Sequence, residues 1–223
     1  MTAKSYSQVS LYEKCPRQWK LRYIDRFPVD REKSSAAARG TMIHESVEKF
    51  LLGEADEVHP EIAQWQGWLQ ELRDEPDGVH AEFQFCLDEE WNPVPWDSED
   101  GHIRGYIDTV YLEIDNNEGT VYEYKTGRKY PEHALQMELY STVVLEMFEA
   151  LEKVTAYPVY FDGKDTDSVP VEFTRDRQGT RKYLWSSRIN RIDKDKYYAA
   201  RPGMYCRWCD FSKSNGGPCE FGG

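Results

Sequence analysis

The 223-residue sequence lacks any long apolar run, and none of its hydrophobic stretches approaches the roughly 18–20 residues that a membrane-spanning helix needs. Its first residues, MTAKSYSQVSLYEK, lack the apolar core of a secretory signal. No GxxxxGK[ST] loop is present, so we expect no nucleotide-driven motor. Internal repeats and low-complexity linkers are also missing. We therefore expect a cytoplasmic protein without a membrane partner, folded as one domain over residues 1–223.

Cysteine is scarce, and its odd count argues against a disulfide framework in a reducing compartment. Cys206 and Cys209 form the segment CRWC, and Cys219 follows after nine intervening residues. Cys15 lies almost the whole chain away, while Cys86 in EFQFCL is most simply a buried core thiol. The other four cysteines match the number of thiolate ligands in a four-thiolate zinc or iron–sulfur site. Either metal would tie the two ends of the chain together.

The net charge of −12 is unevenly distributed. Residues 1–44 hold 9 Lys/Arg against 4 Asp/Glu, and residues 173–223 hold 11 against 5. The middle, residues 45–172, holds 8 against 31. Two basic ends beside an acidic middle suit a protein whose ends contact phosphate, although an acidic solubilising surface with chance basic ends explains the pattern equally well.

Hydrophobic periodicity and turn residues predict the order helices, three strands, helix, strand, helix, which is an α/β domain with helical extensions. A first helix ends near Lys14 with Ser5 or Ser7 as its cap, and Pro16 begins a second. SSAAARG is interpreted as a connector. The remaining helices are expected at 41–53, 61–74, 133–151 and 174–199, and the strands at 79–91, 102–114, 121–127 and 153–161.

Two charges interrupt the predicted strand VYEYKTG. Glu123 and Lys125 are two residues apart, so in a strand their side chains leave the same face. Asp108 lies on the preceding strand, and a hairpin would bring it close to Glu123, because neighbouring strands are about 4.8 Å apart. Two such carboxylates repel unless one is protonated or a cation lies between them, and Mg²⁺ or Mn²⁺ favours oxygen ligands. A surface ion pair remains the alternative at this point.

Three other residues are candidates for the same site. His44 lies on a predicted helix whose apolar face is made by other residues. Gln136 and Tyr140 are one helical turn apart and share a face just downstream of the strand. Each of the three is also compatible with an ordinary surface or packing role.

Taken in order, these segments resemble the RecB-type branch of the PD-(D/E)XK nuclease superfamily, which includes the nuclease domains of RecB and AddB and the CRISPR-associated Cas-four exonucleases. The resemblance covers nearly the whole chain. It rests on six segments in the family's order: SLYEKCPRQWKLRYID, GTMIH, GYIDTV, EYKTG, QMELY and the tail with CRWC and Cys219. It implies a restriction-endonuclease-like core, a central mixed sheet flanked by helices. Residues 1–78 would form a helical part, 79–172 the catalytic sheet and helix, and 173–223 a basic helix and cysteine-rich tail.

The resemblance also implies roles for single residues. His44, Asp108, Glu123 and the main-chain carbonyl of Tyr124 would hold Mg²⁺ or Mn²⁺. Lys125 would position or activate the attacking water, together with Asp108 and Glu123 as catalytic groups. Glu82 could match an acidic residue of an intermediate motif. A four-iron four-sulfur cluster would be bound by four residues: Cys15, Cys206, Cys209 and Cys219. Zinc is the alternative occupant of this site.

The implied activity is metal-dependent hydrolysis of DNA at ends or in single strands, during recombination, repair or replication. Gln136, Tyr140, Arg17 and Lys20 would contact the DNA, and a helicase, integrase or recombination protein could be a partner. Aromatic residues near the basic ends, Trp19, Tyr23 and Trp208, could stack on bases or pack in the core. Two alternatives stay open: a nuclease that trims DNA ends for CRISPR adaptation, and a non-catalytic DNA-binding module held by zinc.

Overall fold

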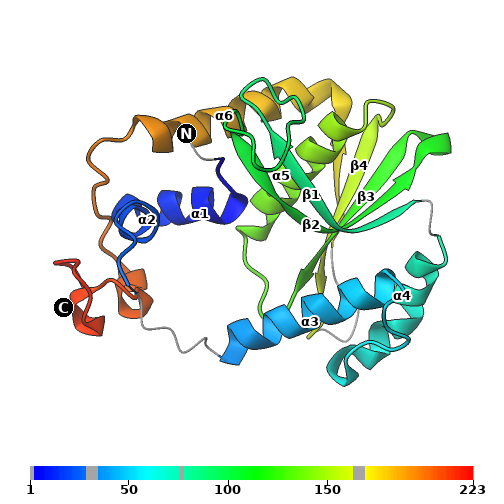
Figure 1. The fold of residues 1–223 in the computed structure, drawn as a ribbon, viewed down its shortest axis with the longest axis horizontal. Coiled ribbons are helices and arrows are strands. Elements are labelled where there is room, and N and C mark those ends of the chain that lie inside the picture. The colour runs from blue at the N-terminus through cyan, green and yellow to red at the C-terminus, as the bar shows by residue number, and fades with distance from the viewer. Residues whose placement is uncertain (1–2, 29–34, 76–77, 163–168, 223) are drawn as a thin grey trace.

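A five-stranded mixed sheet forms the centre of the molecule, with its strands in the order β1-β2-β3-β4-β5 (Figure 1). The structure, a computed structural model, describes residues 3–28, 35–75, 78–162 and 169–222. Neighbouring strands are antiparallel except β3 and β4, which are parallel because helix α5 carries the chain across the sheet between them. The strands span Val79–Leu87 (β1), Ile103–Glu113 (β2), Glu118–Lys125 (β3), Lys153–Tyr160 (β4) and Val171–Thr174 (β5).

Helices cover both faces of this sheet (Figure 1). The α-helices are α1 (Tyr6–Lys14), α2 (Pro16–Tyr23), α3 (Ser35–Leu51), α4 (Gln66–Arg73), α5 (His133–Met147) and α6 (Gln178–Lys194). Short 3₁₀ turns are η1 (Pro60–Trp65), η2 (Ile114–Asn116), η3 (Arg175–Arg177), η4 (Met204–Trp208) and η5 (Lys213–Asn215).

Two separate hydrophobic cores result from these layers. One core joins α5 and α6 to the sheet through Leu139, Trp185 and Val121. The other core lies under α3 and α4 and contains Val47, Leu69 and Tyr124 among its residues. Val121 and Tyr124 belong to the same strand but to different cores, as the alternation of side chains along β3 requires. The end of β3 therefore lies at the boundary between the two cores.

The sheet flanked by helices confirms the expected α/β class and the restriction-endonuclease-like core. The N-terminal capping prediction is also correct, because the Ser5 side chain accepts a hydrogen bond from the main-chain N–H of Gln8 at the start of α1. Cys86 is buried, as expected of a core thiol.

Two predictions about the elements were wrong. The order missed β5, because its four residues, VEFT, alternate over too short a length to be recognised as a strand. The segment SSAAARG was interpreted as a connector, but α3 already begins at Ser35, since alanine has the highest helix propensity. The predicted helix at 61–74 begins as the 3₁₀ turn η1 before it becomes α4.

Within the described part of the chain, no helix is both long and apolar enough to cross a membrane.

Candidate active site

Three carboxylates lie in one row across strands β1, β2 and β3. In the β1–β2 ladder, Ala81 pairs with Thr109 and Phe83 pairs with Ile107, which places Glu82 opposite Asp108. In the β2–β3 ladder, the last pair is Thr109 with Tyr122, so Asp108 and Glu123 follow directly where the ladder ends. A short row of acids in the middle of a sheet is unfavourable unless the negative charge is neutralised.

Asp108 occupies the point where the β2–β3 ladder ends. Its Oδ2 accepts the main-chain N–H of Tyr124 at 2.6 Å, so a side chain replaces the strand-to-strand hydrogen bond. Its Oδ1 lies 3.1 Å from Nδ1 of His44. The carboxylate is therefore fixed from both sides, and its side chain is almost completely buried.

Helix α3 positions His44 from the other side. The helix is anchored by Ile43, Val47 and Phe50, which are fully buried in the second core. Near its start, a Cβ at Gly40 would lie only 3.2 Å from Oγ1 of Thr126, so glycine permits close approach to the end of β3. His44 follows one turn later and reaches Asp108.

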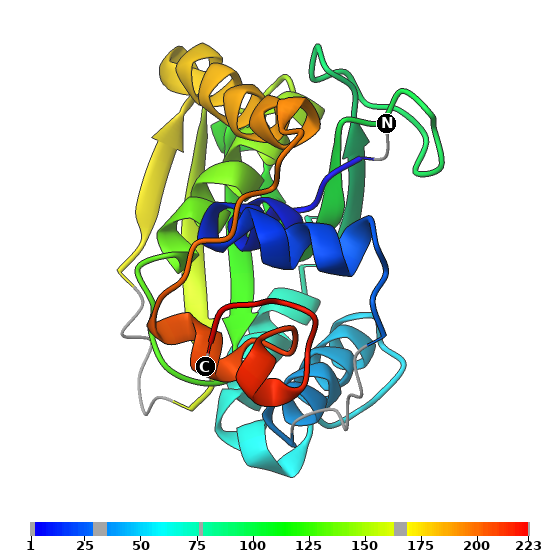
Figure 2. The same cartoon turned by 90° about the vertical axis from the view of Figure 1, so that its left-hand side faces the viewer.

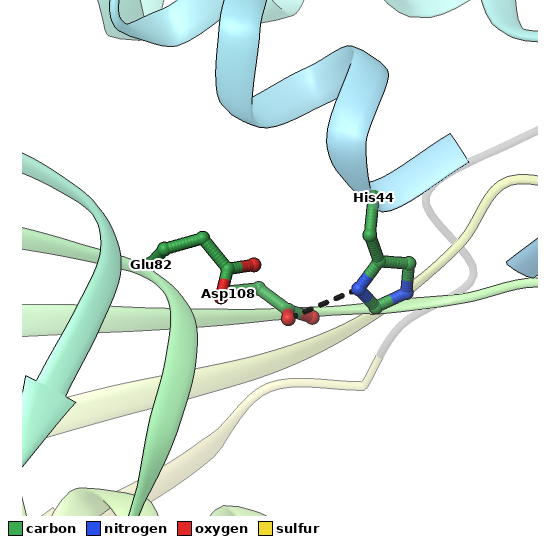
Figure 3. Close-up of side chains that lie close together, drawn as sticks. All are labelled: His44, Glu82 and Asp108. Atoms are coloured by element: carbon green, nitrogen blue, oxygen red, sulfur yellow. Dashed lines mark hydrogen bonds and ion pairs between the residues drawn. The ribbon is translucent and has the colours of Figure 1, made fainter. Parts of the chain in front are cut away.

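His44, Glu82 and Asp108 form a compact group in which one ligand atom of each residue lies within 4.8 Å of the others (Figure 3). The three side chains come from α3, β1 and β2 and point toward one another (Figure 3). Glu82 has a φ of 47°, a left-handed backbone conformation that non-glycine residues rarely adopt. A strained residue at this position is typical of a site where the chain must aim a functional side chain.

Glu123 belongs to a second group, on the α5 side. Its Oε1 accepts hydrogen bonds from Lys125 Nζ at 2.8 Å and from Gln136 Nε2 at 2.6 Å. Lys125 also donates to Oε1 of Gln136 at 2.8 Å, and Gln136 donates to the hydroxyl of Tyr140 at 3.2 Å. The ammonium carries three hydrogens, so one remains for a substrate or a water.

The pKa values of Glu82 and Glu123 are raised above the ordinary value of a carboxyl group. Burial and the nearby Asp108 raise the pKa of Glu123 to about 8, although Lys125 and His44 act in the opposite direction. Burial, Asp108 and Glu48 raise the pKa of Glu82 to about 7. Burial lowers the pKa of His44, but the hydrogen bond and charge of Asp108 outweigh it and leave that pKa raised. Burial is the largest cause for the two glutamates, and the charge of Asp108 contributes to all three shifts; a cation would offset that charge.

These residues fit a divalent cation. Oε2 of Glu123 is buried and has no hydrogen-bond partner among the described residues, although a buried carboxylate oxygen normally has one. His44, Glu82 and Asp108 could hold the ion, and Glu123 lies outside this compact group, on the adjoining strand. Carboxylate oxygens with one imidazole suit Mg²⁺ or Mn²⁺.

The cysteines of the two chain ends lie together, and the C-terminal segment runs beside the N-terminal helices (Figure 2). Cys15, Cys206, Cys209 and Cys219 line one small cavity. Burial raises the pKa of the Cys209 thiol, and the other three cysteines raise it further, which places all four within electrostatic range of one another. The main-chain N–H of Gly203 lies 3.5 Å from Sγ of Cys206, the kind of contact that stabilises a thiolate.

Other residues named from the sequence lie outside the compact group. The Tyr124 side chain points into the second core, where its hydroxyl lies 2.6 Å from Oγ1 of Thr109. Arg17 lines the cysteine cavity, and Lys20 is paired with Asp25 at 2.6 Å. Trp19 is buried in the first core.

Sequence reasoning gave Glu82 only a minor role, although the structure places it in the compact group. The available signal was the register with Asp108, which an alternating strand pattern does not reveal by itself.

Comparison with known proteins agrees with the geometry. The family model described as the PD-(D/E)XK nuclease superfamily matches residues 3–214. A solved structure of a "putative exonuclease" from Eubacterium rectale is 11% identical, with a TM-score of 0.53 over 96% of this chain and 88% of the other, which shows a shared fold. The crystal structure of SSO0001 is 17% identical, with a TM-score of 0.49 over 98% of this chain and 85% of the other. A sequence search of curated proteins found no match.

We predict that Glu82→Gln weakens Mn²⁺ binding at least about tenfold, because loss of a direct ligand should cost as much as loss of an outer-shell partner. Isothermal titration calorimetry measures this change. Glu45→Gln is the matched control. Glu45 lines the same surface cavity as His44 and Glu82 but is outside the compact group. Equal Mn²⁺ affinity in wild type and Glu82→Gln would remove Glu82 from the ligand set.

We also predict that the protein without divalent cations loses stability as the pH rises from about 5 to about 8. The folded state keeps a proton on Glu123 up to a pKa of about 8, whereas the unfolded chain releases it near the ordinary value of 4.5. The unfolded state therefore binds fewer protons in this window, and stability falls with pH.

Urea unfolding at several pH values in cation-free buffer measures the slope, which should be shallower in Glu123→Gln. Glu54→Gln, at an exposed position, makes the same change in charge and should keep the wild-type slope. Parallel pH curves for wild type and Glu123→Gln would contradict the assignment.

Proposed function

Because the chain belongs to the PD-(D/E)XK nuclease superfamily, we propose that it is a metal-dependent exonuclease of the RecB-type branch that hydrolyses DNA at ends or in single strands. The observation that carries the proposal is the position of Lys125. Its ammonium contacts Glu123 in the carboxylate site and also lines a large groove that opens beside that site. Substrate in the groove would thus meet the charged groups directly.

Each group has a task in phosphodiester hydrolysis. When bound, Mg²⁺ or Mn²⁺ would lower the pKa of a water and offset charge on the phosphate. Asp108, His44 and Glu82 present their ligand atoms together, and Glu123 adds a buried carboxylate oxygen. The Tyr124 carbonyl is a further proposed ligand.

Lys125 would act on the reacting atoms. Glu123 and Gln136 each accept one of its hydrogens, which fixes the direction of the third. An ammonium held in this way can orient the attacking water or stabilise charge that develops on the phosphate. Tyr140 holds Gln136 and so supports Lys125 indirectly.

The four cysteines would hold a four-iron four-sulfur cluster. Support comes from their shared cavity, from the Gly203 contact to a sulfur and from their origin at both chain ends. A metal at this position would join α1 and α2 to the C-terminal segment, which is otherwise short of regular structure. The cytoplasmic location and a partner in recombination or repair remain predictions of the sequence.

Lys125→Ala should lower the turnover number about 100- to 1,000-fold, the usual cost of removing one donor that stabilises transition-state charge. The assay uses end-labelled linear single-stranded DNA and circular single-stranded DNA with Mg²⁺ or Mn²⁺, and only the linear form should be degraded. Lys49→Ala, on an exposed position of α3, is the control and should retain activity. Full activity in Lys125→Ala would overturn the assigned mechanism, and loss of circular DNA would reject the exonuclease.

Protein purified without oxygen should be brown and contain about four iron atoms per chain. Cys15→Ala should lose the iron and show a lower thermal unfolding midpoint, because the metal then no longer joins the chain ends. Cys86→Ala is the matched control and should keep the iron, since Cys86 lies in the sheet. Zinc in place of iron would reject the cluster and leave the nuclease proposal intact.

A further inference from the structure

The groove beside Lys125 is built from both ends of the chain. Its volume is about 650 Å³, within the roughly 300–1,000 Å³ usual for ligand sites. Its walls come from α1, the segment after β3, the start of α5, α6 and η4. Figure 2 shows the C-terminal segment passing α1 before it reaches η4. Lys125 and Gln136 lie at the wall that adjoins the carboxylates.

One wall of the groove carries a cation and an aromatic ring in contact. Nζ of Lys14 lies 4.3 Å from the centroid of the Tyr205 ring. Tyr205 is 53% exposed, and Tyr130, which also lines the groove, is 56% exposed. Exposed tyrosines on a groove wall offer flat surfaces without filling the space.

The Lys14–Tyr205 contact is held by its neighbours in the chain. Lys14 directly precedes Cys15, and Tyr205 directly precedes Cys206, so both residues flank cysteines of the same cavity. Arg201 adds a second link, since its guanidinium donates to the main-chain carbonyl of Glu13. The ring is therefore fixed in place relative to α1 although it belongs to a short 3₁₀ turn.

The charge of the groove favours an anionic polymer. Its cations are Lys14, Lys125 and Arg188, and its acids are Glu13 and Glu132. The carboxylate of Glu13 lies 3.3 Å from Arg188 and 3.0 Å from Arg191 of α6, so this contact engages both Glu13 and Arg188 and leaves Lys14 as the cation beside the Tyr205 ring. A groove with cations and exposed rings matches an unpaired nucleic-acid strand, whose bases can stack.

We propose that Tyr205, clamped by Lys14 and faced by Tyr130, is a base-stacking platform that makes unpaired DNA the form of substrate bound next to Lys125. The inference rests on the proposed nuclease function and adds the residues that select the single-stranded form. The phosphates would meet Lys14 while a base lies on the tyrosine ring. Duplex DNA, with its bases paired, gains nothing from the platform.

The test measures binding separately from cutting. A fluorescein-labelled single-stranded oligonucleotide is titrated without divalent cations, with anisotropy as the readout. Tyr205→Ala should weaken binding at least about fivefold, and Tyr205→Phe should bind like wild type because the ring is retained. Lys14→Ala should weaken binding and reduce its dependence on salt. Tyr197→Ala, at an 87% exposed tyrosine outside the groove, should have no effect.

Stacking itself has two direct signatures. A 2-aminopurine base in the oligonucleotide should lose fluorescence on binding wild type but not Tyr205→Ala. An abasic oligonucleotide of the same length should bind wild type and Tyr205→Ala equally. A Tyr205→Ala variant that binds the base-containing strand as wild type does, while wild type cuts DNA, would overturn the platform alone. Wild type that cuts no DNA under any condition would reject the proposed function instead.

Discussion

The Asp108 carboxylate that replaces a strand-to-strand hydrogen bond is the interaction on which the rest of the site depends. Because its Oδ2 accepts the N–H of Tyr124, strands β2 and β3 separate at this point. That separation leaves room at the boundary of the two cores for the side chains of Glu82 and Glu123. The same carboxylate reaches His44 with its other oxygen and so joins α3 to the sheet.

Burying several carboxylates in one site is electrostatically unfavourable, and a bound cation would reduce that unfavourable free energy. Buried carboxylates that lie near each other lose the solvation that water would provide, so their charged forms are destabilised. Lys125 and Gln136 donate hydrogen bonds to one carboxylate oxygen of Glu123, whereas the other oxygen has no hydrogen-bond partner among the described residues. Such incomplete compensation is typical of a site formed to receive a cation, since a purely structural carboxylate would have both oxygens satisfied.

The meeting of the chain ends gives the molecule a second constraint. The cysteine cavity draws α1, α2 and the C-terminal segment together, and it sets the distance between Lys14 and Tyr205. This contact forms part of the groove wall that leads to Lys125. The basic ends thus lie next to the acidic site. In the folded chain, cations from the basic ends, which can bind phosphate, therefore lie near carboxylates from the acidic middle, which can bind metal.

The sequence by itself determined the α/β class, most of the helices and strands, and a set of candidates that included His44, Asp108 and Lys125, because periodicity, caps and short motifs are local signals. Only the tertiary structure decided that Glu82 lies beside Asp108, since strand register depends on which faces are buried against α3 and α5. Strand β5 was not predicted because the alternation in its four residues is too short to be distinctive. The pairing of Lys14 with Tyr205 joins residues at opposite ends of the chain, and no local rule relates such positions.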